Sequence, residues 1–296
     1  MPDIELRFHH DMLVLSPPVD AALRKRGFEE EHERELLLVT EPETVLEPLR
    51  LDMMAGAQCL VLPTAGITRA RLAHVRAEEG APDIARVAQE LATRLKPQHV
   101  LAEIGPTGLP LDSTNATTLK ANQAKYADAA TAFDDASLDA FFLNGMTGVD
   151  DMRCALEGVR SVSEIPVFAS VNVDAEGKVA GRKEGVDHVL FVMEEYGASV
   201  VGIQTEAGPE EAAALVERVA ERTSLPILVQ LQVKEACARD PHDAGNPYWH
   251  ADFMMQAANR LCGAGAQFLR ATGAATASYT GALAAATYGR ATVGRE

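Results

Sequence analysis

The chain has 296 residues, of which 47% are hydrophobic, and it carries a formal net charge of -16. This length suits one large α/β domain or two small ones, with a substantial buried core. No apolar run reaches the roughly 20 residues that a membrane helix needs, and the acidic balance opposes binding to phosphate backbones. The segment from Met1 to His10 lacks an apolar core followed by small residues, so no secretory signal is expected. We therefore predict a cytoplasmic protein that binds neither membranes nor nucleic acid.

Short β-rich runs alternate with amphipathic helical stretches along the whole chain, which is typical of parallel strands joined by crossover helices. Apolar residues at helical spacing, such as Met152, Ala155, Leu156 and Val159, predict helices that place one face on a sheet. Most of the β-rich runs are almost continuously apolar, as strands covered on both faces are. The eight predicted strands are Met12–Ser16, Cys59–Pro63, His99–Ile104, Ala140–Leu143, Pro166–Val171, Val200–Gln204, Pro226–Leu231 and Gln267–Ala271.

The joints between these elements also repeat. Gly56, Gly197 and Gly265 each stand between a predicted helix and the next strand, where glycine can take the left-handed conformation that ends a helix. Eight strand-helix units favour a closed (β/α)8 TIM barrel, a fold that typically takes about 250 residues. A doubly wound open sheet is the alternative, but no G-x-G-x-x-G spacing follows the first strand. No Ser, Gly or Pro-rich linker interrupts the alternation, so we predict a single domain over residues 1–296.

Four segments after the predicted strands carry a more specific signal. In order along the chain, they are Thr64–Leu72, Gly105–Gly108, residues 170–181 and Val201–Glu210. Together they resemble the homocysteine S-methyltransferase family, including the homocysteine-binding barrel of cobalamin-dependent methionine synthase. The likeness extends from about Leu13 to Leu283.

The resemblance implies a TIM barrel that holds zinc on three cysteines, one after the sixth strand and an adjacent pair after the eighth. Such a zinc ion lowers the thiol pKa of homocysteine, so that the thiolate attacks the methyl group. The corresponding positions here are Thr205, Thr272 and Gly273, and these cannot replace soft thiolate ligands. We therefore predict no metal at the family's site and no certain cofactor. By analogy with relatives, a corrinoid on a partner protein is the expected methyl carrier.

Three further departures concern the ligand. The family's glycine-rich opening after the first strand is replaced by the proline-containing segment Ser16–Asp20. Asn144 stands where the family has an acidic residue that meets the substrate amino group, and a neutral amide cannot pair with an ammonium as a carboxylate does. Gln232 replaces an asparagine after the seventh strand. These changes predict that the small-molecule substrate has changed as well as the metal.

Side chains at the C-terminal ends of barrel strands converge on one mouth, where this fold places its active sites. Glu103 is the candidate catalytic residue there, because a carboxylate at a strand end would be desolvated unless its charge is offset. It is interpreted either as a general base or cation anchor, or as the partner of Arg270 in a structural ion pair. The predicted substrate-binding residues are Ser16, Thr64, Asn144, Asn172, Gln204, Thr205, Gln232, Arg270 and Thr272, with Gln230 beside them.

Other candidates lie outside this set. Arg69 could hold a ligand carboxylate, although Arg69 and Arg71 also suit a solvated helix surface. The acidic run Glu29–Glu35 is interpreted as another solvated helix surface. A replacement metal site on Cys237, His242 and His250 is a further hypothesis, but the spacing of these residues matches no familiar zinc finger. The other three cysteines show no Cys-x-x-Cys pairing, and Cys154 and Cys262 are predicted to be buried thiols.

These observations leave three functional hypotheses. The first is a methyltransferase without thiolate-bound zinc that moves a methyl group between a small methylated substrate and a corrinoid or thiol acceptor. The second is a noncatalytic barrel that binds a small ligand or a partner protein. The third is homocysteine methylation with a metal bound on the loop that contains Cys237.

Overall fold

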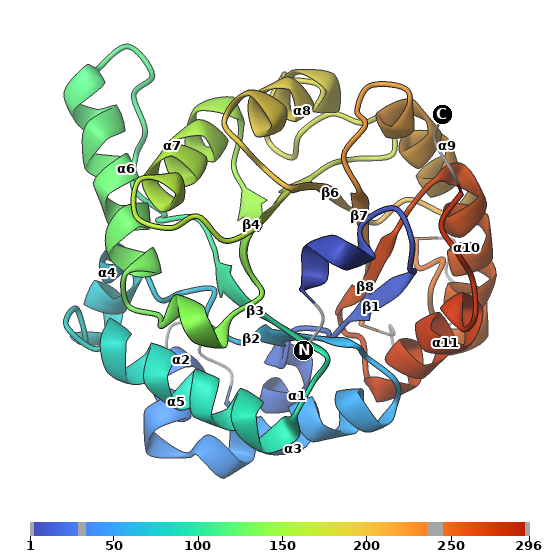
Figure 1. The fold of residues 1–296 in the computed structure, drawn as a ribbon, viewed down its shortest axis with the longest axis horizontal. Coiled ribbons are helices and arrows are strands. Elements are labelled where there is room, and N and C mark those ends of the chain that lie inside the picture. Colours follow the sequence, from blue (N-terminus) through green and yellow to red (C-terminus); the bar gives the residue numbers. More distant parts are fainter. Residues whose placement is uncertain (1–2, 29–33, 236–244, 294–296) are drawn as a thin grey trace.

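The computed structural model describes residues 3–28, 34–235 and 245–293. Over these residues eight parallel strands pair in chain order, and β1 pairs with β8 to close the barrel (Figure 1). This closure excludes the open sheet and confirms the predicted (β/α)8 TIM barrel. The strands are β1 (Leu13–Leu15), β2 (Cys59–Leu62), β3 (His99–Ile104), β4 (Ala140–Met146), β5 (Val167–Asn172), β6 (Val200–Thr205), β7 (Ile227–Val233) and β8 (Phe268–Gly273).

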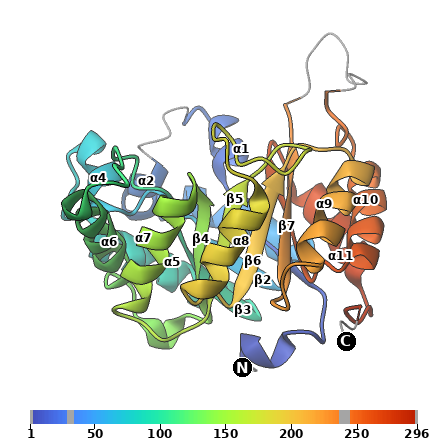
Figure 2. The ribbon, with the colours of Figure 1, turned by 90° about the horizontal axis from the view of Figure 1, so that it is seen from above.

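Helices surround the barrel on all sides (Figures 1 and 2). Within the described residues, none is long and apolar enough to cross a membrane. The α-helices are α1 (Asp20–Arg24), α2 (Arg34–Thr40), α3 (Pro42–Met54), α4 (Arg69–Leu72), α5 (Ala81–Leu95), α6 (Ala116–Ala130), α7 (Val149–Arg160), α8 (Val186–Glu195), α9 (Pro209–Ala220), α10 (Ala251–Ala264) and α11 (Ala277–Thr287). The described part of the chain also forms the 3-10 helices η1 (Ile4–Arg7), η3 (Ala73–Val75) and η4 (Asp135–Ser137).

All eight predicted strands are present, and the largest difference is at β4. The prediction ended this strand at Leu143, whereas pairing shifts after Leu143 and resumes where Met146 pairs with Val171. Gly145, in the shifted segment, has a φ of +72°, a conformation that the apolar pattern does not encode. The helix-ending glycines were predicted correctly, because Gly56 and Gly265 have φ values of +108° and +106°.

The core has two layers, one inside the barrel and one between the strands and the helices. The outer layer contains the predicted helical faces, including Met152 and Val159 on α7, and the buried thiols of Cys154 and Cys262. The inner layer is closed at the N-terminal end of the strands by η1 and Phe8. The Phe8 ring lies edge-on to the rings of Phe168 and Phe268, with centroids 6.2 and 5.9 Å away.

Candidate functional site at the barrel mouth

A buried ion pair crosses the barrel between β3 and β8. Arg270 Nη2 lies 3.1 Å from Glu103 Oε2, and Nη1 lies 3.4 Å from Oε1. The side chains are only 1% and 7% exposed. The Arg270 guanidinium also donates through Nε to the carbonyl of Ser16 at 2.9 Å and lies over the Phe142 ring. The ion pair that the sequence offered as one interpretation of Glu103 is therefore present.

Amide side chains extend this pair into a network. Asn144 Nδ2 donates to Glu103 Oε1 at 2.5 Å, and Gln230 Nε2 donates to Asn144 Oδ1 at 2.8 Å. Gln230 also donates to Ser170 Oγ and accepts from Arg270 Nη1. Both Glu103 oxygens thus accept from protein donors, and five strands are cross-linked inside the barrel. The network fixes Glu103 in place, whatever its role toward a ligand.

The predicted hydroxyl residues are bonded to the backbone of the strand ends. Ser16 Oγ accepts from the N–H of Val61 at 2.9 Å, and Thr64 Oγ1 donates to the Glu103 carbonyl at 2.8 Å. Thr272 Oγ1 donates to the carbonyl of Leu231 at 3.5 Å. All three hydroxyl side chains are buried. They hold neighbouring strands in register here, and their contact with a substrate stays a prediction.

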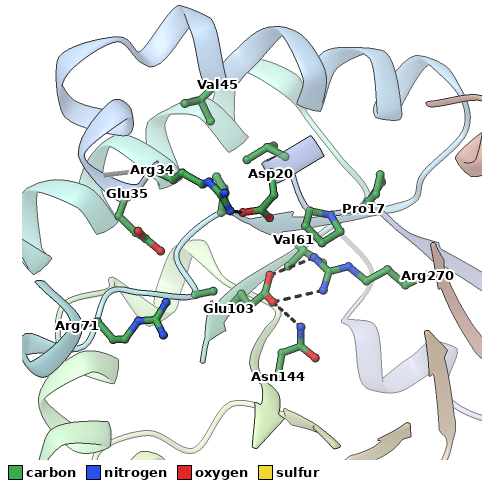
Figure 3. A pocket seen from close by; sticks show the side chains of 14 residues that line it. Pro17, Asp20, Arg34, Glu35, Val45, Val61, Arg71, Glu103, Asn144 and Arg270 are labelled. Carbon is green, nitrogen blue, oxygen red and sulfur yellow. Dashed lines mark hydrogen bonds and ion pairs between the residues drawn. The ribbon is translucent and has the colours of Figure 1, made fainter. Parts of the chain in front are cut away.

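The remaining candidates divide between two separate pockets, whereas the sequence treated them as one mouth. A charged pocket of about 230 Å³ takes in Glu103, Asn144 and Arg270, and we call it the first pocket (Figure 3). A second pocket of about 440 Å³ takes in Asn172, Gln204, Thr205 and Gln232. The strand order explains the division, because the first group comes mainly from the β3, β4 and β8 ends and the second from the neighbouring β5, β6 and β7 ends.

The second pocket has three amide side chains in its lining, those of Asn172, Gln204 and Gln232, beside small apolar residues. Gln204 Nε2 donates to Gln232 Oε1 at 3.0 Å, and Gln232 in turn donates to Glu206 Oε1 at 2.8 Å. Glu206 is also paired with Lys234. Asn172 Oδ1 is buried and has no hydrogen-bond partner among the described residues. An unpaired buried acceptor can take a donor from a ligand, so Asn172 keeps its candidate role.

The first pocket contains an unpredicted carboxyl, that of Glu35 on α2. Glu35 was assigned to a solvated acidic helix surface, and this is wrong, because the residue is only 8% exposed. Its Oε1 accepts from the N–H of Gly66 at 2.6 Å. The available signal was helical spacing, since Glu35 lies three residues before Leu38, which is fully buried. The rest of the run, residues 29–33, lies outside the described residues.

Three arginines also line the first pocket. Arg34 is paired with Asp20, and Arg270 is paired with Glu103, while Arg71 extends toward the centre of the pocket (Figure 3). Arg69 was the arginine expected to reach a ligand, but it is paired with Glu79 away from this pocket. Position along α4 explains this difference, because Arg69 and Arg71 are two residues apart and therefore lie on different sides of the helix.

Burial and local bonding act in opposite directions on Glu35. Burial of the side chain raises the pKa of the carboxyl to about 7, although hydrogen bonds from the backbone at Glu35 and Gly66 and the charge of Arg71 favour ionisation. Asp20 is the nearby like charge that adds to the increase. A carboxyl of this kind can both accept and release a proton near neutral pH.

At the β6 and β8 ends, where the resemblance places the family's zinc ligands, Thr205, Thr272 and Gly273 offer no thiolate. Thr205 Oγ1 accepts from the N–H of Ala207, Thr272 is bonded as described above, and Gly273 has no side chain. Among the described residues, no group of three or more His, Cys, Asp or Glu side chains gathers into a metal site. Cys237 and His242 lie outside the described residues, and His250 begins α10 by accepting from the N–H of Asp252.

Comparison with known proteins supports the resemblance. No family model matches the chain. It is 26% identical over 209 residues to methionine synthase from Mycobacterium tuberculosis and 24% identical over 208 residues to methionine synthase from Mycobacterium leprae. Each match covers 66% of this chain but only 17% of the relative, so the chain spans about a sixth of the length of these curated relatives.

Comparison with solved structures supports the same resemblance. The oxidized form of the homocysteine methyltransferase MmuM from Escherichia coli superposes with a TM-score of 0.74, at 17% identity, over 93% of this chain and 96% of that one. The metallated form gives a TM-score of 0.73. The fold is therefore a TIM barrel of the homocysteine methyltransferase type. With the similarity to methionine synthase, this confirms the resemblance to the homocysteine S-methyltransferase family that the four sequence segments indicated.

Proposed function

We propose that the protein is a methyltransferase that transfers a methyl group between a small methylated substrate and a corrinoid or thiol acceptor, without thiolate-bound zinc. The observation that carries the proposal is a charged pocket at the mouth of a homocysteine methyltransferase-type barrel in which threonines and a glycine stand at the β6 and β8 ends. The fold supports the reaction class, and the side chains support a different way of activating the reactants.

A cationic methyl donor suits this arrangement. In a sulfonium or quaternary ammonium compound, the leaving group departs as a neutral molecule with the electron pair of the broken carbon–heteroatom bond, so the donor needs no metal for activation. The acceptor supplies the electron pair of the new bond to carbon. A corrinoid on a partner protein is one such acceptor, proposed by analogy with methionine synthase, and a small thiol is the other. Carboxylates and amides of the two pockets would orient the donor.

A noncatalytic ligand-binding barrel is the second candidate, and one observation favours it. Both oxygens of Glu103 are already occupied by Arg270 and Asn144, so the carboxylate predicted to be catalytic is used within the protein. A polar pocket with such a fixed network can bind a ligand without chemistry. The two candidates differ in turnover and not in binding.

The first test combines metal content with methyl transfer. Tag-free protein would be analysed by inductively coupled plasma mass spectrometry, and we expect far less than one zinc per chain. The same sample would then be incubated with sulfonium and quaternary ammonium donors, using reduced cobalamin or homocysteine as the acceptor. We expect a methylated product with at least one pair.

Each alternative result has a defined meaning. Stoichiometric zinc that is lost in the Cys237→Ser variant would replace the zinc-free proposal with metal-dependent homocysteine methylation. Tight binding of a methyl compound without any product would favour the noncatalytic barrel. Failure of both cobalamin and homocysteine to react with every donor would remove the proposed activity.

A further inference from the structure

We propose that Glu35 is the general base of the first pocket, which takes the proton from a small thiol that accepts the methyl group. This inference rests on the proposed function and selects the thiol as the acceptor at this site. Glu35 belongs to no residue set that the family resemblance supplies, and its position comes from the structure alone.

The geometry places the Glu35 carboxyl inside the pocket and restrains it there. Oε1 accepts from the N–H of Gly66, and the side chain points into the space shared with Arg71 and Glu103 (Figure 3). Gly66 leaves room for this approach, because a Cβ at that position would collide with the Glu35 carboxyl. The second carboxylate oxygen can face a ligand while the first is held by the backbone.

The other charged groups of the described residues that line the first pocket are Asp20, Arg34, Arg71, Glu103 and Arg270. Asp20 and Arg34 form one pair, and Glu103 and Arg270 form another. Arg71 is the cation whose charge acts on Glu35, and it favours the ionised form. Asp20 and Glu103 already form ion pairs with arginines and are less suited to accept a substrate proton, because protonation would weaken an existing ion pair.

Proton affinity distinguishes Glu35 from an ordinary surface glutamate. Its carboxyl pKa is about 7 because the side chain is buried. A free thiol has a pKa of about 8.5 and an ordinary glutamate about 4.3, a difference of about 4 pKa units that opposes proton transfer. With Glu35 as the base, this difference falls to about 1.5 pKa units. A base with a pKa near the working pH is the more effective catalyst. Glu35 would thereby do part of what zinc does for the thiol in the resembling family.

The Glu35 carboxylate takes the thiol proton, and the thiolate sulfur attacks the methyl carbon of a sulfonium donor. The new carbon–sulfur bond forms with the thiolate electron pair, while the old bond breaks and its electrons leave with a neutral thioether. The protonated Glu35 then returns its proton to water through the open pocket. No oxidant or reductant is required.

The experiment compares Glu35→Gln with wild type in methyl transfer from a trialkylsulfonium donor to homocysteine. Glutamine has nearly the same shape and can still accept from Gly66, so the fold is preserved. We expect kcat/KM at pH 7 to fall by about 10²- to 10⁴-fold, with activity recovering as the pH approaches the thiol pKa. Glu35→Asp should restore part of the neutral-pH rate. Glu217→Gln, which removes an exposed carboxylate on α9, is the matched control.

A second readout separates this inference from the proposed function. Alkylation of homocysteine by iodoacetamide at pH 7 needs no methyl donor, and we expect the bound thiol to react faster on wild type than on Glu35→Gln because Glu35 takes its proton. If wild type transfers methyl groups and Glu35→Gln has the same rate and pH profile, the inference is overturned while the function stands. If no donor reacts, the function fails. Faster alkylation that depends on Glu35 then supports the base, and equal alkylation rates on wild type and Glu35→Gln overturn it.

Discussion

Arg270 shows how a residue that looks like a ligand contact can be a structural one. Its guanidinium makes hydrogen bonds to Ser16, Glu103 and Gln230 and has almost no exposed surface. A buried charge is costly unless its partners are in place, and here the partners come from β3, from β7 and from Ser16, the residue directly after β1. The position of Arg270 at a strand end was predictable, but its three partners depend on the register of the closed barrel.

The first prediction concerns this pair. Arg270→Met should lower the free energy of unfolding by about 3–5 kcal/mol, because Glu103 is left buried without its cation. Urea denaturation followed by circular dichroism measures the change. The double variant Arg270→Met/Glu103→Leu removes both charges and should recover most of the loss. A single variant that is as stable as wild type would show that the pair is not buried as described.

The second prediction concerns the buried carboxyl of Asp52 on α3, which accepts from Thr280 Oγ1 on α11 at 3.1 Å. Burial raises the pKa of Asp52 from its ordinary value of 3.8 to about 7. Between these values the folded protein binds a proton that the unfolded chain does not, so this group's contribution to stability is lost as the pH rises from about 4 to about 7.

Asp52→Asn keeps the acceptor for Thr280 and removes the titration. We expect the variant to match wild type near pH 4 and to be more stable by about 4 kcal/mol at pH 8. Urea midpoints at the two pH values measure this difference. Glu217→Gln should show the wild-type pH dependence. An Asp52→Asn effect of equal size at both pH values would contradict the assignment of the shifted carboxyl.

At the scale of elements, close packing between α6 and α7 depends on Gly158. A Cβ built there would lie 2.5 Å from the carbonyl oxygen of Gln123 and 2.8 Å from the Cβ of Tyr126. The first of these is a backbone atom and cannot move without shifting α6. The close approach of α6 and α7 therefore requires that residue 158 have no side chain. A hydrophobic pattern does not reveal this requirement.

The third prediction follows from this contact. Gly158→Ala should destabilise the protein by about 1–3 kcal/mol through overpacking, although alanine is the better helix former. Gly263→Ala on α10 is the matched control, because nothing lies within 4 Å of its added Cβ and we expect a small gain in stability. Thermal unfolding of both variants measures the contrast. A stabilised Gly158→Ala protein would mean that α6 and α7 lie further apart than described.

At the scale of the whole molecule, the fold was predictable because its determinants are local and repeated. Apolar runs such as Leu60–Leu62 and glycine at joints such as Gly197 each indicate one element, and eight such units imply a barrel. For the site, the sequence predicted only which strand end each residue stands at. The division of the site into two pockets depends on the order of the strands around the barrel, and the inclusion of Glu35 depends on α2 lying beside the first pocket; no short-range pattern encodes either placement.

The closure of the barrel by η1 and Phe8 determines where reactants would enter and leave. The N-terminal segment lies at the end of the barrel opposite the pockets (Figure 2), and Phe8 and Ile4 pack there onto the innermost apolar layer, so the described residues close that end. A molecule that enters at the mouth must leave by the same route. Under the proposed function, donor and acceptor would therefore both enter through this one opening. A corrinoid-bearing partner that docked there would hold the leaving group inside the barrel until the partner dissociated.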